Sequence, residues 1–203
     1  DGVGDIAVSA PGADGGKGTV YVIRLTAEGG VSGFEQVREM VDAFDMHVSS
    51  AWGFGASVAA VGDVDGDGVP DVAIGTPGLP EIVKDGGGAV VALLRTTGEA
   101  KKVATVKPPK ELGYTGSELG VSMGVLHQSP RNRTLVLAMG AWGAAFDEMT
   151  TGAVALSLLS ISDKSDDVGA TVIWPLQSPL DCQLSDWSGW TECTEECGGG
   201  EQA

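Results

Sequence analysis

Residues 54–77 read FGASVAAVGDVDGDGVPDVAIGTP, and this stretch decides the fold. Two short apolar runs with strand character, Gly55–Val61 and Val72–Gly75, enclose a glycine-rich acidic loop. The loop places four carboxylates at positions 1, 3, 5 and 9 of a cation-binding pattern, as Asp63, Asp65, Asp67 and Asp71. Gly68 stands at position 6, where such a loop turns sharply, and Val69 at position 7 can offer its carbonyl oxygen.

Carboxylates this close together repel one another unless a cation neutralises them, and a set of oxygen ligands suits Ca²⁺. An EF-hand needs a Glu at position 12, but this position is Ile74 and no helical pattern flanks the loop. The alternative is a solvated acidic turn, because Asp and Gly are common in turns. The spacing favours a calcium loop between two strands.

A second copy of the loop stands at the start of the chain. Residues 1–12 (DGVGDIAVSAPG) align with residues 67–78, so that Asp1 and Asp5 match Asp67 and Asp71. The alignment places the first two ligand positions of this loop before residue 1. We therefore expect a truncated second calcium loop with Asp1 and Asp5 as ligands.

The same unit can be traced three times, with a period of about 65 residues. The corresponding apolar runs are Ile6–Ala10, Val72–Gly75 and Leu137–Gly140, and then Gly18–Leu25, Gly88–Leu94 and Gly152–Leu159. A leading strand occurs twice, at Gly55–Val61 and Gly120–Leu126, and a weaker last strand is best seen at Val103–Val106 and Gly169–Ile173. Four short strands per repeat predict an all-β fold, a partial β-propeller of about three four-stranded antiparallel blades. Residues Phe34–Phe44 have weak helical character and are expected to form a loop or outer strand.

This pattern resembles the FG-GAP repeat, the unit of the β-propeller at the head of integrin α subunits. Phe54-Gly55 supplies the "FG" part, and Gly75-Thr76-Pro77 stands where the family has Gly-Ala-Pro. The resemblance implies a calcium-binding propeller over residues 1–174, with further blades upstream of Asp1.

The third repeat departs from the pattern. Leu119-Gly120 replaces Phe-Gly, and residues 127–134 (HQSPRNRT) stand where the acidic loop is expected. This segment has two Arg and no carboxylate, so we expect it to bind no metal. Asn132-Arg133-Thr134 is a sequon for N-glycosylation, placed in a predicted exposed turn.

Composition limits the class of protein. The net charge of -16, from 12 basic and 28 acidic residues, excludes sequence-independent nucleic-acid binding as a main role. No apolar run approaches the ~20 residues needed to span a bilayer, so no membrane insertion is expected. Lys101, Lys102 and Lys107 are interpreted as a solvated face or edge protection. His47 and His127 belong to no catalytic set, which predicts that the protein is not an enzyme.

Composition changes at a Pro-bearing linker, residues 175–180, and all three cysteines follow it. Residues 181–203 resemble the start of a thrombospondin type 1 module, because they contain the pattern W-x-x-W-x-x-C-x-x-x-C-G-x-G from Trp187 to Gly200. Cys193 and Cys197 form no zinc site on their own, since no further ligand is nearby. The resemblance implies a small disulfide-rich module in which Cys182, Cys193 and Cys197 pair with cysteines beyond Ala203, and in which Trp187 is a candidate for C-mannosylation. Its O-fucosylation position is Glu196, which has no hydroxyl.

The two resemblances together imply an extracellular protein, secreted or at the cell surface, that binds Ca²⁺ and recognises a protein or glycan ligand in adhesion. The alternative is a non-catalytic accessory propeller of a secreted or surface hydrolase such as a phospholipase. Adhesion predicts further thrombospondin modules or a membrane anchor in the parent sequence, whereas the alternative predicts a hydrolase domain.

Overall fold

The computed structural model describes residues 2–37, 53–77, 87–106, 118–129, 131, 133–141, 145–146, 149–150, 153–160 and 171–175. These residues form strands and one short helical turn. The elements in chain order are β1 (Ile6–Ala10), α1 (Ala13–Gly16), β2 (Thr19–Leu25), β3 (Val31–Gln36), β4 (Val58–Gly62), β5 (Asp71–Gly75), β6 (Ala89–Leu94), β7 (Ala100–Val106), β8 (Ser122–Ser129), β9 (Thr134–Ala141), β10 (Ala145–Phe146), β11 (Met149–Thr150), β12 (Ala153–Ser160) and β13 (Thr171–Pro175).

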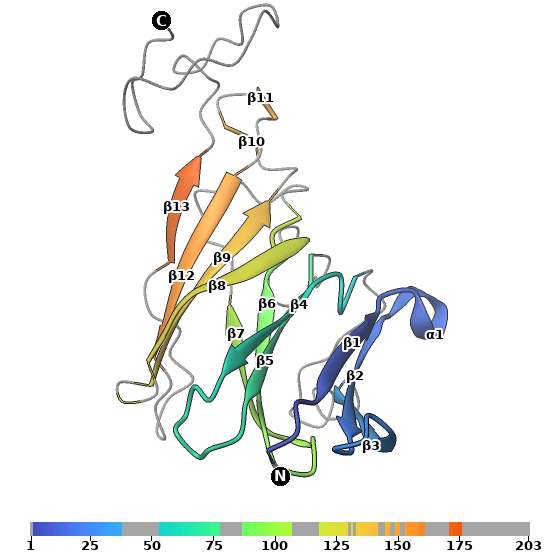
Figure 1. Cartoon of the computed structure of the whole chain (residues 1–203). Helices are drawn as coiled ribbons and strands as arrows, with labels where there is room; N and C mark the ends of the chain where they lie inside the picture. The colour runs from blue at the N-terminus through green and yellow to red at the C-terminus, as the bar shows by residue number, and fades with distance from the viewer. Residues whose placement is uncertain are drawn as a thin grey trace, which may run out of the picture.

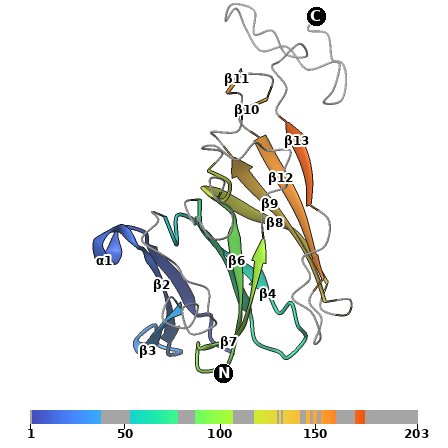
Figure 2. The same cartoon turned by 180° about the vertical axis from the view of Figure 1, so that it is seen from behind.

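The strands form three antiparallel sheets, which we call blades, and a small hairpin (Figure 1). Blade 1 has the order β1-β2-β3, blade 2 has β4-β5-β6-β7, and blade 3 has β8-β9-β12-β13 with the hairpin β10-β11 inserted before β12. Opposite views show the three sheets side by side with blade 2 in the middle (Figures 1 and 2). The predicted all-β fold is therefore confirmed, and the arrangement is that of a partial β-propeller.

Blade 2 is buried on both faces, because successive strand residues point to opposite sides of a sheet. Ala73 and Val91 pack with Leu137 of blade 3 in one apolar cluster, and the neighbouring Ile74 packs with Val20 of blade 1 in another. Strand β6 is buried along its whole length. The apolar runs found in the sequence thus form the cores between neighbouring blades.

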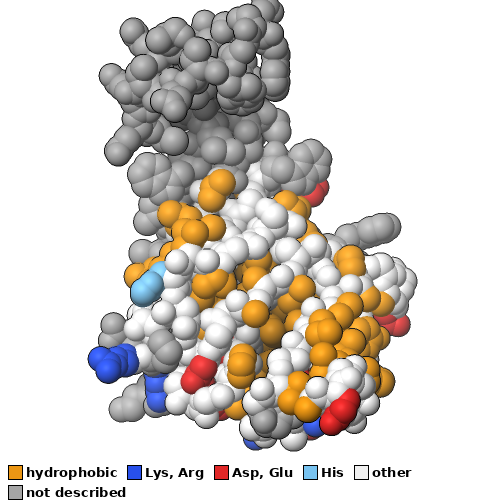
Figure 3. Space-filling model, viewed as in Figure 1, with side chains coloured by type: hydrophobic (Ala, Val, Ile, Leu, Met, Phe, Trp, Pro, Cys, Tyr) orange, Lys and Arg blue, Asp and Glu red, His pale blue; other side chains and the backbone are white. Residues whose placement is uncertain are grey.

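Blade 1 leaves an apolar face uncovered in the described structure. Ile6, Val8 and Phe34 are large exposed hydrophobic side chains on this sheet. Hydrophobic side chains gather over this blade at the right of the space-filling view (Figure 3). The ring of Phe34 meets that of Tyr21 edge-on, with centroids 6.0 Å apart.

The Phe-Gly motif and its Leu-Gly counterpart make the same structure at the start of β4 and β8. The Gly55 N–H donates to the carbonyl of Gly75 at 3.0 Å, and the Gly120 N–H donates to the carbonyl of Gly140 at 2.9 Å. Both leading glycines have left-handed φ angles, of 82° and 96°, which glycine adopts without strain. The residue before each of them is fully buried, Phe54 in blade 2 and Leu119 in blade 3.

Blades 2 and 3 meet through their backbones. The Gly88 N–H donates to the carbonyl of Leu119 at 2.8 Å, and the Ser57 hydroxyl donates to the carbonyl of Gly120 at 2.8 Å. A Cβ at Gly75 would lie 2.0 Å from the Gly120 carbonyl oxygen, closer than any side chain can come. Glycine is therefore required at this junction for steric reasons.

The end of blade 3 lies one residue inside the predicted linker. Strand β13 ends at Pro175, which pairs with Ala153 of β12. Residues 176–203, with the rest of the linker and the predicted thrombospondin segment, lie outside the described residues.

Candidate metal centre

The acidic loop connects β4 to β5, and the carboxylate of Asp63 organises its backbone. One Asp63 oxygen, Oδ1, accepts from the N–H groups of Gly66 at 2.7 Å and Asp67 at 3.1 Å. The other, Oδ2, accepts from Gly68 N–H at 2.8 Å. Gly66 and Gly68 have φ angles of 80° and 88°, so their lack of a side chain permits the tight turn. These hydrogen bonds fix both the Asp63 carboxylate and the backbone of the loop around it.

Asp71 is the fully buried carboxylate of the group and the first residue of β5. Its Oδ2 accepts from Val64 N–H at 3.0 Å, and its Oδ1 accepts from Leu94 N–H at 2.8 Å. Burial raises the pKa of Asp71 to about 6 because desolvation disfavours the charged form, and the two backbone hydrogen bonds oppose this shift only in part. The nearby negative charge of Asp65 raises this pKa further.

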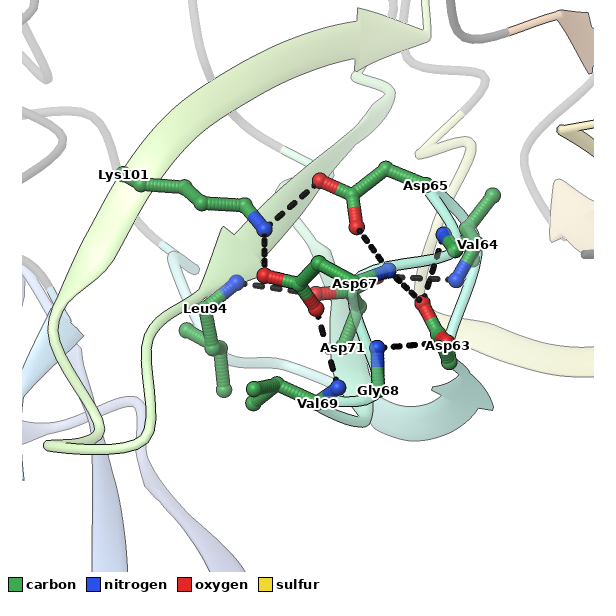
Figure 4. Close-up of polar contacts among 10 residues, drawn as sticks. Asp63, Val64, Asp65, Asp67, Gly68, Val69, Asp71, Leu94 and Lys101 are labelled. Carbon is green, nitrogen blue, oxygen red and sulfur yellow. Dashed lines mark hydrogen bonds and ion pairs between the residues drawn. The ribbon is translucent and has the colours of Figure 1, made fainter.

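Three carboxylates of the loop converge (Figure 4). Asp63, Asp65 and Asp71 each offer an oxygen, and these atoms lie within 4.8 Å of one another. Ligand oxygens on opposite sides of a Ca²⁺ ion are about 4.6–5.2 Å apart, twice the metal–oxygen distance of about 2.3–2.6 Å. The spacing and the oxygen-only chemistry of this donor set fit a calcium ion.

Lys101 of β7, an edge strand of blade 2, reaches the same loop, so its side chain is not on a purely solvated face; edge protection, the other interpretation of this lysine, stays a prediction. Its Nζ lies 2.7 Å from Asp65 Oδ2 and also contacts Asp67 Oδ2. The hydrogen bond from Lys101 lowers the pKa of Asp67. Burial alone would lower the pKa of Lys101, but its bonds to the two aspartates outweigh that effect and raise the pKa. The loop thus draws a cation to two of its carboxylates.

Val69, the predicted carbonyl ligand, lies in the loop as expected. Its N–H donates to Asp67 Oδ1 at 2.9 Å, and its side chain packs against the core between blades 1 and 2. The role of its carbonyl oxygen as a ligand stays a prediction.

In blade 1, Asp5 makes one of the contacts made by Asp71. Its Oδ1 accepts from Leu25 N–H at 3.0 Å, as Asp71 Oδ1 accepts from Leu94 N–H. This shared bond supports the alignment of the two loops. Asp5 is exposed, whereas Asp71 is buried, and Asp1 lies outside the described residues.

In blade 3, the corresponding turn has other chemistry. Gln128, at the end of β8, donates from its side-chain amide to the backbone carbonyl of Asp63 in blade 2. Sequence reasoning did not identify Gln128, because a contact between residues 65 apart leaves no local pattern. The absence of metal from this turn stays a prediction.

The remaining predicted modification and disulfide sites lie outside the described residues. They are Asn132, Cys182, Trp187, Cys193 and Cys197. Among the described helices, none is long and apolar enough to cross a bilayer.

Comparisons with known proteins connect the site to a family. Residues 54–93, which include β4, the acidic loop and β5, match the family model described as "FG-GAP repeat". The chain is 40% identical over 76 residues to "Integrin alpha pat-2" of Caenorhabditis briggsae, which covers 37% of this chain and 6% of that protein. It is 38% identical over 39 residues to "Thrombospondin type-1 domain-containing protein 7A" of Mus musculus, which covers 16% of this chain and 2% of that protein. The chain therefore contains an FG-GAP repeat and is similar to an integrin α, and its matches span only a small part of each relative.

Proposed function

We propose that this chain is part of an extracellular module for adhesion or ligand recognition, in which Ca²⁺ stabilises the β4–β5 loop. The proposed ligands are the carboxylates of Asp63, Asp65, Asp67 and Asp71 and the carbonyl oxygen of Val69. The observation that carries the proposal is the convergence of Asp63, Asp65 and Asp71 oxygens within 4.8 Å. The match to an FG-GAP repeat and the similarity to an integrin α support the integrin-like role.

Backbone hydrogen bonds organise the loop around two of its carboxylates. Backbone N–H groups fix both oxygens of Asp63 and both oxygens of Asp71. A cation that binds here needs to order few additional groups, and preorganisation of this kind increases affinity. The bound ion would also offset the repulsion among the carboxylates. We infer that Ca²⁺ rigidifies this end of blade 2, and that the adjoining surface recognises a protein or glycan.

Calorimetric titration of the whole chain with CaCl₂ tests the site. We expect a Kd of roughly 10⁻⁴–10⁻³ M, the range of extracellular calcium modules. Asp65→Asn removes one ligand charge without changing the shape of the side chain, and it should raise the Kd at least about tenfold, the equivalent of about 1.4 kcal/mol. Asp14→Asn in the exposed turn α1 removes the same charge far from the loop and should leave the Kd unchanged.

Two results would overturn the calcium proposal. One is a titration without calcium-dependent heat, and the other is equal affinity in the wild type and Asp65→Asn.

We propose Asp1 and Asp5 as ligands of a second loop of this kind. Because this second loop is separate from the β4–β5 loop, Asp5→Asn should leave the affinity of the β4–β5 loop for Ca²⁺ unchanged.

The measured affinity also bears on the compartment. A Kd in the proposed range suits an extracellular protein, whereas a value below about 10⁻⁶ M suits an intracellular sensor or buffer.

We propose glycosylation at Asn132 and Trp187 and disulfide bonding of Cys182, Cys193 and Cys197. Non-reducing peptide mass spectrometry of the protein secreted from cultured cells tests these modifications, and free thiols in the native protein would contradict the extracellular placement.

A binding role is favoured over a catalytic one by the chemistry of the loop. Residues 63–71 contain four aspartates and no Ser, Thr, Cys, His or Lys. The two best-held carboxylates, those of Asp63 and Asp71, accept hydrogen bonds from backbone amides, which suits ion binding. An accessory propeller of a hydrolase would share this loop and stays the alternative, tested by the presence of a hydrolase domain in the parent sequence.

A further inference from the structure

Lys101 owes its position to an irregularity in blade 2. Strand β7 pairs with β6 through Leu93 and Lys102, and then through Leu94 and Ala100, so that Lys101 is the extra residue between the two pairs. A bulge of this kind inserts one residue without a partner in the ladder and turns its side chain in a new direction. The bulge places the Lys101 side chain toward the acidic loop, 34 residues away from Asp67 in the sequence (Figure 4).

The ammonium of Lys101 takes up carboxylate oxygens that belong to the metal centre. It lies 2.7 Å from Asp65 Oδ2 and contacts Asp67 Oδ2. The other Asp65 oxygen accepts from the Asp67 N–H at 3.3 Å. Asp65 is also one of the three residues whose oxygens converge within 4.8 Å. One carboxylate is therefore shared between the lysine and the proposed cation site.

Lys101 and a bound Ca²⁺ cannot both bind the Asp65 carboxylate strongly. An ammonium and a divalent ion bonded to the same group would lie a few ångströms apart and repel each other. The lysine side chain has a flexible stem and can move its charge into water, whereas Asp63 and Asp71 are fixed by backbone hydrogen bonds. The lysine is thus the partner that can leave.

We propose that Lys101 is a tethered counter-ion of the calcium loop, which holds Asp65 and Asp67 in the absence of a divalent ion and is released when Ca²⁺ binds. This inference rests on the proposed function of the loop. Lys101 offsets part of the negative charge of the four loop aspartates, and it weakens calcium binding because the ion must displace it. The residue is a positioning and affinity-setting group and not a ligand.

Calorimetry with a Lys101→Met variant measures the competition. Methionine keeps an unbranched side chain of similar length and removes the charge, so the Kd for Ca²⁺ should fall about 2- to 5-fold, the effect expected of a partly exposed ion pair. Lys101→Arg keeps the charge and should remain near the wild-type Kd. Lys17→Met changes the net charge equally at an exposed position in blade 1 and should shift the Kd by less than about twofold.

Amine labelling measures the release itself. The wild-type chain is treated briefly with an acetylating reagent, with CaCl₂ or with a chelator, and the modified lysines are quantified by peptide mass spectrometry. Acetylation of Lys101 should increase several-fold with Ca²⁺, because release from the two carboxylates leaves the amine accessible to the reagent. Acetylation of Lys17 should not change.

The outcomes separate the two proposals. If the wild type binds Ca²⁺ and Lys101→Met has an equal or higher Kd, or if labelling of Lys101 does not respond to Ca²⁺, the inference is overturned and the calcium site stands. If neither the wild type nor Lys101→Met binds Ca²⁺, the proposed function fails and the inference fails with it. If only Lys101→Met binds Ca²⁺, the wild-type lysine is not released by the ion, and both the proposed function and the inference are overturned.

Discussion

The β4–β5 turn of blade 2 and the β8–β9 turn of blade 3 occupy the same place in two matching sheets. Gly62 pairs with Asp71 in one blade, and His127 pairs with Val136 in the other. The buried acid of the first turn therefore corresponds to an aliphatic residue in the second, and Asp63 corresponds to Gln128. The comparison shows that the four-stranded sheet of a blade does not depend on the acidic loop. The loop supplies carboxylates at one end of a sheet that also forms without them.

The two inner strands also share a bulge but differ in what covers it. The pairing shifts between Ala60 and Gly62 in β4 and between Val125 and His127 in β8. The extra residue is Val61 in blade 2, which is 2% exposed against blade 3, and Leu126 in blade 3, which is 60% exposed. The same backbone irregularity thus supports the core in one blade and faces outward in the other.

The prediction with the largest expected effect tests whether the Phe-Gly and Leu-Gly junctions stabilise their blades in the same way. Phe54→Ala should lower the free energy of unfolding by about 3–5 kcal/mol, and Leu119→Ala should lower it by about 2–5 kcal/mol, because both side chains are fully buried at equivalent junctions. Urea denaturation followed by circular dichroism measures both changes. A cost below about 1 kcal/mol for Leu119→Ala alone would show that Leu-Gly does not replace Phe-Gly in blade 3.

A smaller effect tests the difference between the two bulges. Val61→Ala removes buried apolar groups and should cost about 2 kcal/mol of unfolding free energy. Leu126→Ala, at the matching exposed position, should cost less than about 0.5 kcal/mol. Equal costs in the same urea experiment would mean that Leu126 is covered in solution, and the contrast between the blades would no longer hold.

The smallest effect tests the contact between the two turns. Gln128→Ala removes the hydrogen bond to the Asp63 carbonyl and should cost about 0.5–1.5 kcal/mol. Because this bond helps to position the first residue of the acidic loop, the calcium Kd should also rise about two- to threefold. His127→Ala, at the exposed neighbouring residue, is the control and should change neither value measurably. An unchanged melting temperature and Kd in Gln128→Ala would remove this link between the blades.

Much of the frame could be predicted from the sequence, because the features that build it are local. Alternating apolar runs give strands, and the recurring glycines mark turns, so the sequence predicts the strands of blades 2 and 3 and the first two strands of blade 1. Residues Phe34–Phe44 are predicted to form a loop or outer strand; β3 (Val31–Gln36), the outer strand of blade 1, includes the first three of them, and residues 38–44 lie outside the described residues. The acidic spacing of residues 63–71 likewise identified the candidate site.

The interactions that reach the loop from elsewhere could not be predicted. Lys101 arrives through a bulge in β7, and Gln128 arrives from another blade, so neither leaves a local pattern. The exact register of the strands also leaves no local pattern in the sequence. The glycine that contacts the next blade as Gly18 does is Gly87, one residue before the Gly88 at which the sequence alignment began. The position of a bulge or a strand pair depends on long-range packing, which periodicity does not contain.

The glycine junction between blades 2 and 3 fixes the distance between the two sheets at one point. Because Gly75 and Gly120 leave no space for a side chain, the two sheets approach most closely at that point, and any larger residue there would force them apart. Away from it the separation is set by the volume of the side chains between the sheets, such as Leu137 and Met139. Larger side chains would open the wedge and smaller ones would close it, and every sheet beyond the wedge would rotate with it. The angle between neighbouring sheets determines how many sheets complete a ring, so we expect the volume of these cores to be one determinant of ring size.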